Sequence, residues 1–192
     1  NAMDFDDLLV NLCRLLQQNE AVRTKYQDAF QYVLVDEYQD TNYVQYLLVK
    51  LLAEPSNMVC VVGDDAQSIY SFRGADIRNI LQFQRTYPNA RLFKLERNYR
   101  STQTIVQAAN SLIKHNEHQI YKEVYSEKEK GSAIDLSRFP TDREEGDGIA
   151  HMIQQEDLAL RRYSPDDIAI LSRTNAQSRV FENALRQLNI PY

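Results

Sequence analysis

The chain has 192 residues, 43% of them hydrophobic and 26% charged, which allows one domain or two small domains with packed cores. Its longest apolar runs are far shorter than the roughly 20 residues that a bilayer-spanning helix needs, so a membrane protein is not expected. The formal net charge of −5 argues against a protein that coats nucleic acid through bulk positive charge, although a local groove stays possible. Cys13 and Cys60 lie within apolar patterns, which predicts buried thiols in a reducing cytoplasm.

Hydrophobic spacing predicts alternating helices and strands in the first part of the chain. Asn1 and Ala2, which precede Met3, have the character of a tag remnant and are left out of the predicted fold. In chain order the predicted elements are a helix over about 5–16, a helix over 20–29, a strand at 32–35, a helix over about 44–51, a strand at 58–62, a helix over about 77–87, a strand at 91–95 and a helix over about 105–113.

A charged, weakly patterned stretch at 121–131 is expected to be a linker or a surface excursion. The elements predicted after it are a strand at 132–139, a helix over about 142–162, a strand at 167–172 and a helix over about 176–188. This alternation predicts an α/β fold in which helices flank a mostly parallel sheet. Ligands of such sheets bind at the carboxyl ends of strands, and three predicted strand ends carry polar side chains, at 36–37, 63–65 and 97–100.

Two adjacent carboxylates, Asp36 and Glu37, end the strand predicted at 32–35. In nucleotide-hydrolysing α/β proteins the first acid after such a strand holds Mg²⁺ and a neighbouring residue orients the attacking water. For an isolated acidic pair, a polar strand end with helix-capping acids is the commoner interpretation. This pair is not isolated, because two more polar segments follow predicted strands.

The second polar segment, residues 63–75, holds a neutral amide, two aromatic side chains and an arginine. The Gln67 amide can hydrogen-bond both a water molecule and a terminal phosphate, which suits a sensor of the nucleotide state. Tyr70 and Phe72 are either core residues or, together with Arg73, a stacking platform for unpaired bases. Composition does not choose between these two interpretations.

The third segment, residues 95–101, places Arg100 at the start of a predicted helix. A guanidinium there can reach a phosphate through two parallel hydrogen bonds. The alternative interpretation is a salt bridge from Arg100 to Glu96 or Asp36.

The three segments together resemble motifs of the UvrD-, Rep- and PcrA-type superfamily 1 helicases. Residues 35–41 (VDEYQDT) are similar to motif II, residues 63–75 (GDDAQSIYSFRGA) to motif III, and residues 95–101 (LERNYRS) to motif IV. Residues 3–9 (MDFDDLL) resemble the segment that leads into motif II, and residues 171–179 (LSRTNAQSR) a signature of the second motor domain. The resemblance covers almost the whole chain.

Carried over by position, the resemblance implies roles for five residues in the binding and hydrolysis of ATP. Asp36 would hold Mg²⁺, Glu37 would activate water, and Gln67 would link the phosphate to DNA. Tyr99 would stack on adenine, and Arg100 would contact the γ-phosphate as an arginine finger.

The resemblance also implies a DNA surface. Tyr70, Phe72 and Arg73 would touch single-stranded DNA, which such relatives translocate from 3′ to 5′. Phe72 stands where several relatives have tryptophan, and it keeps a stacking face. Ala66 stands where many have an acid, which puts a local hydrogen bond in doubt.

The same resemblance divides the chain between two RecA-like (P-loop NTPase) motor domains. Residues 4–95 would be the later part of the first domain, and residues 96–192 the opening part of the second. None of the five glycines precedes Lys-Ser or Lys-Thr, so the phosphate-binding loop of such motors is missing and these 192 residues alone are expected to be inactive.

The expected function is therefore part of a cytoplasmic ATP-dependent DNA helicase acting in repair or replication. Its partners would be ATP, single-stranded DNA and duplex junctions, with no membrane. Two alternatives stay open: the motor of a helicase–nuclease, or a degenerate module that binds DNA or protein without catalysis.

Overall fold

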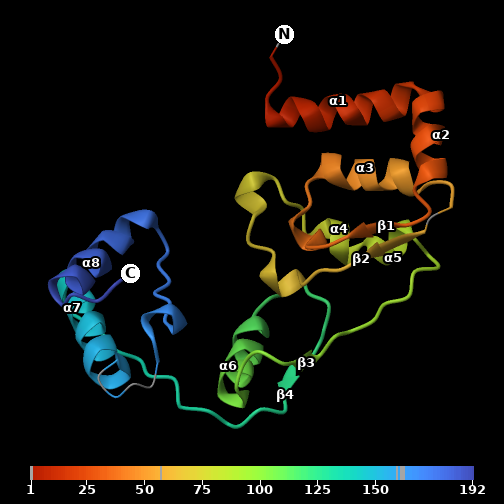
Figure 1. Cartoon of the computed structure of the whole chain (residues 1–192). Coiled ribbons are helices and arrows are strands. Elements are labelled where there is room, and N and C mark those ends of the chain that lie inside the picture. The colour runs from red at the N-terminus through yellow and green to blue at the C-terminus, as the bar shows by residue number, and fades with distance from the viewer. Residues whose placement is uncertain (1, 57, 159, 161–162) are drawn as a thin grey trace. The chain divides into compact units, whose positions relative to one another are not determined.

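The computed structural model describes residues 2–56, 58–158, 160 and 163–192. Its contacts divide the chain into two compact units, Asn1–Ala133 and Ile134–Tyr192. Figure 1 traces both units, which are described here one after the other. Within the described residues, no helix combines the length and the apolar character needed to cross a bilayer.

The first unit opens with α1 (Phe5–Gln18) and α2 (Glu20–Ala29). The Asp4 carboxylate accepts the backbone N–H of Asp7 and starts α1, because the first amides of a helix lack partners within it. The third helix, α3 (Tyr43–Ala53), lies between α1 and the first strand pair (Figure 1). The apolar core between these helices is formed by Cys13, Leu16 and Leu48.

Two short parallel strands, β1 (Val33–Val35) and β2 (Val59–Val61), form the first sheet. Val33 pairs with Val59 and Val35 with Val61, so both strands end at the same edge. The predicted strands at 32–35 and 58–62 are therefore confirmed. Their shared edge carries the first two polar segments.

Short helical elements connect this sheet to a second strand pair. They are the 3₁₀ turns η2 (Asp65–Gln67) and η3 (Ser71–Arg73) and the helices α4 (Arg78–Leu81) and α5 (Phe83–Thr86). A further 3₁₀ turn, η1 (Tyr38–Asp40), lies between β1 and α3. The second parallel pair consists of β3 (Arg97–Asn98) and β4 (Tyr125–Ser126), with α6 (Gln103–Ile113) between them in the chain. The stretch expected to be a linker or surface excursion thus contains a paired strand.

The second unit is built mainly from two helices. α7 (Asp142–Met152) continues into a π-helical turn, Ile153–Leu158, and packs against α8 (Asn175–Gln187). Its apolar core is formed by Ala150, Ile153, Ala184, Leu185 and Ile190. The helix predicted over 142–162 is helical through residue 158, and residues 159, 161 and 162 lie outside the described part of the chain.

Three predicted strands are wrong. Residues 91–95, 132–139 and 167–172 are not strands, because no neighbouring segment among the described residues supplies the backbone hydrogen bonds that a strand requires. Many of the apolar side chains that suggested them are exposed, with Leu95 at 84% and Leu171 at 94%, although Ile168 and Ile170 are partly buried against the core of the second unit. The observed fold is α/β with two small parallel sheets rather than one continuous sheet. The prediction of two buried thiols is also half wrong, since Cys13 is buried but Cys60 is exposed.

Candidate nucleotide site and neighbouring aromatic cluster

The backbone reverses sharply where β1 ends. Glu37 adopts a left-handed conformation with φ of 49°, which is uncommon for a residue with a side chain and is often found at functional sites. Asp36 Oδ1 accepts the Glu37 N–H at 2.9 Å, and the Tyr38 N–H donates to the Val62 carbonyl at 3.0 Å. Both acidic side chains remain exposed to solvent at this edge.

A buried glutamine joins the acids to the end of β2. Gln39 is 1% exposed, and its Nε2 donates to Glu37 Oε2 at 2.8 Å. Its Oε1 accepts the backbone N–H of Asp64 at 3.0 Å. Gly63 permits this approach, since a Cβ at that position would lie 2.6 Å from Gln39 Oε1. The side chain of Gln39 therefore orients Glu37 from one end and fixes the turn after β2 from the other.

Residues 64–67, the glutamine turn, are held by the Asp64 carboxylate. Asp64 Oδ1 accepts the Ala66 N–H at 3.0 Å, and Oδ2 accepts Gln67 Nε2 at 2.8 Å. Gln67 is exposed. We name Glu37, Gln39, Asp64 and Gln67 the acid–amide network, because hydrogen bonds connect them in that order. The sequence-predicted Glu37 and Gln67 are thus brought into one connected group.

A lysine from a distant segment of the chain forms ion pairs with two carboxylates of the glutamine turn. Lys122 Nζ lies 2.7 Å from Asp64 Oδ1 and 2.6 Å from Asp65 Oδ1. Burial lowers the pKa of Lys122, but its hydrogen bonds to the two carboxylates outweigh burial, and the net pKa is raised. Burial raises the pKa of Asp64, yet the bonds from Lys122 and Gln67 make the net pKa lower than usual. Both shifts favour the charged pair.

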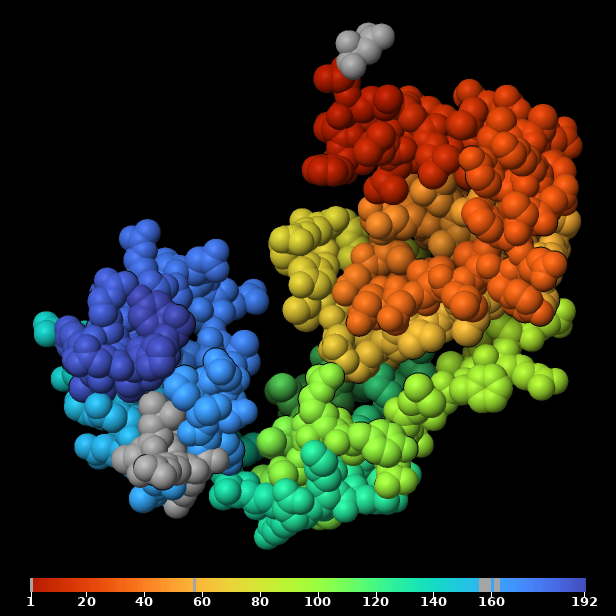
Figure 2. All heavy atoms as spheres, viewed as in Figure 1, coloured from red at the N-terminus to blue at the C-terminus, as the bar shows by residue number. Residues whose placement is uncertain are grey.

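The aromatic cluster consists of Tyr70, Phe72 and Arg73. Phe72 is 76% exposed and Tyr70 is 39% exposed, and their ring centroids lie 5.9 Å apart. The Arg73 Cζ lies 5.4 Å from the Tyr70 centroid and 5.5 Å from the Phe72 centroid. Figure 2 shows this yellow segment at the surface. Such exposure is unlike that of core aromatic residues and leaves ring faces available for stacking.

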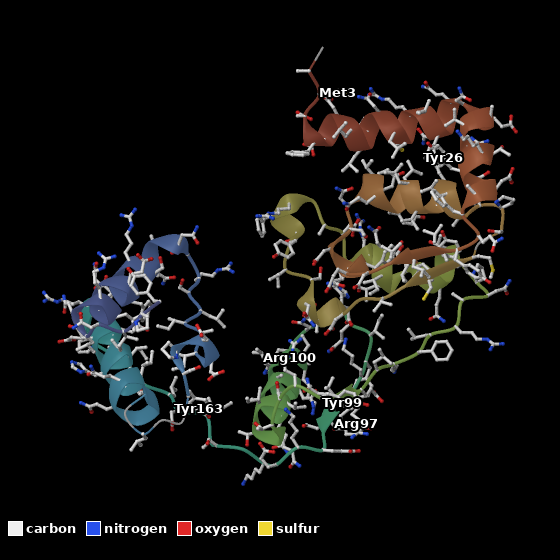
Figure 3. All side chains as sticks on the ribbon, in the orientation of Figure 1. Met3, Tyr26, Arg97, Tyr99, Arg100 and Tyr163 are labelled. Atoms are coloured by element: carbon white, nitrogen blue, oxygen red, sulfur yellow. The ribbon has the colours of Figure 1, made fainter. Side chains whose placement is uncertain are left out.

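Tyr99 and Arg100 follow β3, and the contacts recorded for them are with nearby residues rather than with the acid–amide network or the aromatic cluster. Tyr99 is 72% exposed, and the Arg97 Cζ lies 4.7 Å from its ring centroid (Figure 3). Asn98 Oδ1 accepts the backbone N–H of Arg100 at 2.9 Å, which fixes the main chain before α6. Among the described residues, no salt bridge or hydrogen bond involves the Arg100 guanidinium, so the alternative pairing with Glu96 or Asp36 is not formed.

The structure therefore joins motifs II and III but records no contact between Arg100 and the acid–amide network in the described residues. Sequence reasoning did not single out Gln39 or Lys122. Gln39 lies inside motif II and its chemistry as a double-ended amide was available from the sequence. Lys122 lies in the charged stretch at 121–131, where no pattern distinguishes it from its neighbours.

A metal ion at this edge would find few protein ligands. Among the described residues, no group of three or more His, Cys, Asp or Glu side chains could hold an ion. Mg²⁺ at nucleotide sites commonly uses one or two carboxylates and completes its shell with water and phosphate oxygens. The exposed Asp36 carboxylate fits this requirement, because Oδ2 makes no recorded bond while Oδ1 accepts the Glu37 N–H.

An apolar hollow lies in the second unit rather than at this edge. It has a volume of 620 Å³ and is lined mainly by apolar side chains, including Ile168, Ile170 and Leu185. It contains none of the sequence-predicted site residues.

The fold and the site define an α/β protein whose parallel strand pair ends in connected acidic and amide side chains. The family model described as the UvrD/REP helicase N-terminal domain matches residues 1–88, and that of the UvrD-like helicase C-terminal domain matches residues 93–192. The chain belongs to the UvrD-like helicase family.

Curated proteins from two staphylococcal species are similar to this chain along its whole length. The chain is 47% identical over 191 residues to the ATP-dependent DNA helicase PcrA of Staphylococcus epidermidis. It is also 47% identical over 191 residues to the ATP-dependent DNA helicase PcrA of Staphylococcus aureus. All of this chain is covered in both cases, but it spans only 26% of the length of each relative.

Proposed function

We propose that this chain is a middle part of an ATP-dependent DNA helicase that moves 3′ to 5′ on single-stranded DNA and unwinds duplex DNA. The observation that supports it best is the acid–amide network, in which Gln39 connects the Glu37 carboxylate to the turn that carries Gln67. Similarity along the whole chain to proteins named ATP-dependent DNA helicase supports the same function.

Asp36, Glu37 and Gln67 are proposed to act on the terminal phosphate of ATP. Asp36 would hold Mg²⁺, which supplies charge neutralisation at the phosphates when bound. Glu37, kept in place by Gln39, accepts a proton from the attacking water. Gln67 reports whether the terminal phosphate is present, because its amide can bond a phosphate oxygen in exchange for Asp64.

Tyr99 and Arg100, the two residues that follow β3, are also proposed to bind ATP. The exposed Tyr99 ring supplies a face on which adenine can stack. The Arg100 guanidinium, with no recorded partner among the described residues, would neutralise charge on the γ-phosphate. Both residues must approach the acid–amide network for hydrolysis, which agrees with a nucleotide cleft that closes on its ligand.

The aromatic cluster is proposed to bind single-stranded DNA. Stacking on Tyr70 and Phe72 needs no particular base sequence, and Arg73 adds positive charge for the phosphate backbone. Tyr70 lies three residues after Gln67 in the chain, so a change at the phosphate can be passed to the DNA through one short segment. Duplex junctions would be the substrate of the whole protein.

We place the boundary between the two motor domains at residues 95 and 96, which gives residues 4–95 to the first domain and 96–192 to the second. The change from one family model to the next, between residues 88 and 93, supports this placement. The contact-based division after Ala133 differs, since residues 96–133 are attached to the preceding part through Lys122.

The proposal is tested with the full-length protein that carries this sequence. We expect single-stranded DNA to stimulate ATP hydrolysis, and a duplex with a 3′ tail to be unwound in preference to one with a 5′ tail. Absence of DNA stimulation would contradict the function and favour a non-catalytic binding module. A preference for the 5′ tail would contradict the polarity alone.

A second measurement concerns the 192 residues by themselves. Because they contain no Gly-Lys-Ser or Gly-Lys-Thr loop, we expect no measurable ATP turnover even with single-stranded DNA. Easily measured turnover would overturn this expectation. A helicase–nuclease would show DNA cleavage by the full-length protein in addition to unwinding, and fractionation should place the protein in the cytoplasm.

A further inference from the structure

Lys122 makes an ion-pair contact that motif resemblance does not predict. Its side chain is 21% exposed and lies between the carboxylates of Asp64 and Asp65. The Asp65 side chain is 3% exposed, and its second oxygen accepts the Ile120 N–H at 2.8 Å. Removing one partner of such a poorly solvated pair leaves an uncompensated charge, unlike the loss of an ordinary surface salt bridge.

Lys122 and Gln67 share one carboxylate. Asp64 Oδ1 accepts from Lys122, and Asp64 Oδ2 accepts from Gln67 Nε2. The position of the carboxylate therefore depends on Lys122 together with the Ala66 N–H, and the orientation of the exposed Gln67 amide depends on the carboxylate. Loss of the lysine would free Asp64 to turn and Gln67 to adopt other rotamers.

The segment that carries Lys122 is attached to the strand that precedes Arg100. The Glu123 N–H donates to Glu96 Oε1 at 3.0 Å, and the Tyr125 N–H donates to the Glu96 carbonyl at 2.8 Å. β4 then pairs with β3, and Arg100 follows β3 by two residues. A continuous set of hydrogen bonds thus runs from the glutamine turn to the strand pair.

Residues 96–133 are attached to residues 4–95 by few polar contacts. Among the described residues, the hydrogen bonds recorded between residues 4–95 and 96–133 are those from Ile120 and Lys122 to Asp64 and Asp65. The ion pairs recorded between these two ranges are the two made by Lys122. The Lys94 ammonium also lies 5.8 Å from the Tyr121 ring centroid, but both side chains are exposed and neither bonds the glutamine turn, so this contact does not replace the lysine.

We infer that Lys122 is a positioning residue that couples the glutamine turn to the β3–β4 strand pair, so that Gln67 and Arg100 are set by one contact. The inference rests on the proposed function for its catalytic consequence. Through Asp64, Lys122 holds the phosphate sensor in one orientation. Through the main chain of residues 122–126, it docks the strand pair on the same turn.

The test compares Lys122→Met with Lys114→Met in the full-length protein. Lys114 is an exposed lysine at the end of α6, and no side-chain bond is recorded for it in the described part of the chain. We expect Lys122→Met to lower the DNA-stimulated kcat about tenfold while the KM for ATP stays within about twofold. Lys114→Met should match the unmodified protein, and Lys122→Arg should recover most of the kcat because it keeps the charge.

Hydrogen exchange measures the positioning without any activity. In Lys122→Met, the amides of Ala66 and Gln67 should exchange at least about tenfold faster than in Lys114→Met, because the Asp64 carboxylate no longer holds the turn. If Lys122→Met does not fold, Lys122→Gln takes its place, since it keeps a hydrogen-bond donor without the charge.

Unchanged exchange and unchanged kcat in the Lys122 variant would overturn the inference. A lower Tm with no faster local exchange, and no recovery in Lys122→Arg, would also overturn it and leave only a structural role. If the unmodified protein shows no DNA-stimulated hydrolysis, the proposed function fails, and the exchange measurement still decides whether Lys122 positions the turn.

Discussion

The acid–amide network and the aromatic cluster lie close together in the chain but are held very differently. In the network, Gln39 is 1% exposed and every step from Glu37 to Gln67 is a hydrogen bond of 3.0 Å or less. In the cluster, Phe72 is 76% exposed, and its ring lies beside the Tyr70 ring and the Arg73 guanidinium. The difference suggests that the hydrolytic groups are preorganised by the fold, whereas the cluster leaves its rings free for a ligand.

The strongest test of preorganisation is Glu37→Gln in the full-length protein. An amide cannot accept a proton from water, but its oxygen can still accept the hydrogen bond from Gln39. We expect kcat for ATP to fall about a thousandfold, with ATP affinity within about twofold. Steady-state hydrolysis and equilibrium nucleotide binding measure the two effects.

Glu117→Gln provides a control, since Glu117 is an exposed acid in the loop after α6. It should leave both quantities unchanged. Loss of ATP binding in Glu37→Gln would assign Glu37 a structural role in place of a catalytic one.

The cluster is tested by Phe72→Ala. Stacking of one base on an aromatic ring contributes about 1–3 kcal/mol, so the DNA concentration for half-maximal stimulation should rise about tenfold or more. Basal hydrolysis without DNA should be preserved, because Phe72 makes no recorded contact with the network in the described residues.

Phe93→Ala is the matched control, as Phe93 is similarly exposed at 78% but lies outside the cluster. Equal losses of basal and DNA-stimulated hydrolysis in Phe72→Ala would instead identify Phe72 as a packing residue.

The same contrast explains what the sequence could predict. Local patterns identified the strands β1 and β2, the longer helices, and the acids and amide at the strand ends, because these depend on neighbouring residues. The strands expected at 91–95, 132–139 and 167–172 needed partners from elsewhere, and hydrophobic pattern alone does not specify a partner. Lys122 was missed for the same reason, since its role depends on Asp64 and Asp65, which lie far away in the chain.

A smaller effect is expected for Gly63→Ala, which crowds the network without removing a polar group. The new Cβ would lie 2.6 Å from Gln39 Oε1 and 2.9 Å from Ile80 Cδ1, so Gln39 must shift. We expect a loss of about 1–3 kcal/mol in stability, as in other overpacked sites, and slower hydrolysis because Glu37 loses its fixed partner. Thermal unfolding and kcat measure these effects.

Gly74→Ala offers the opposite case, because a Cβ there meets no atom within 4 Å but the φ of 84° is unfavourable for alanine. It should lower the Tm without slowing basal hydrolysis. A normal kcat in Gly63→Ala would show that Glu37 does not depend on the position of Gln39.

The smallest effect is expected for Tyr38→Phe, beside the network. Tyr38 is fully buried against Phe83, and its hydroxyl has no hydrogen-bond partner among the described residues. Removing an unsatisfied buried hydroxyl should leave the free energy of unfolding at neutral pH unchanged or increase it by up to about 1 kcal/mol, so the Tm should stay the same or rise. A lower Tm would indicate that the hydroxyl is in fact bonded.

Measuring the stability of Tyr38→Phe and of the unmodified protein at alkaline pH gives a sharper test than the Tm at neutral pH. Burial, followed by the nearby Tyr87 and Tyr46, raises the pKa of Tyr38 to about 12. The folded state keeps the proton above pH 10, where the unfolded state releases it, so this contribution to stability is present below about pH 10 and is lost as the pH rises toward 12. Tyr38→Phe should therefore lose less stability than the unmodified protein as the pH rises from about 10 to 12. Tyr87, whose pKa burial also raises, remains in both proteins, so the difference between the two Tm curves isolates Tyr38. Parallel curves would show that the Tyr38 hydroxyl ionises as readily in the folded protein as in the unfolded chain, and that the core beside the network is open to water.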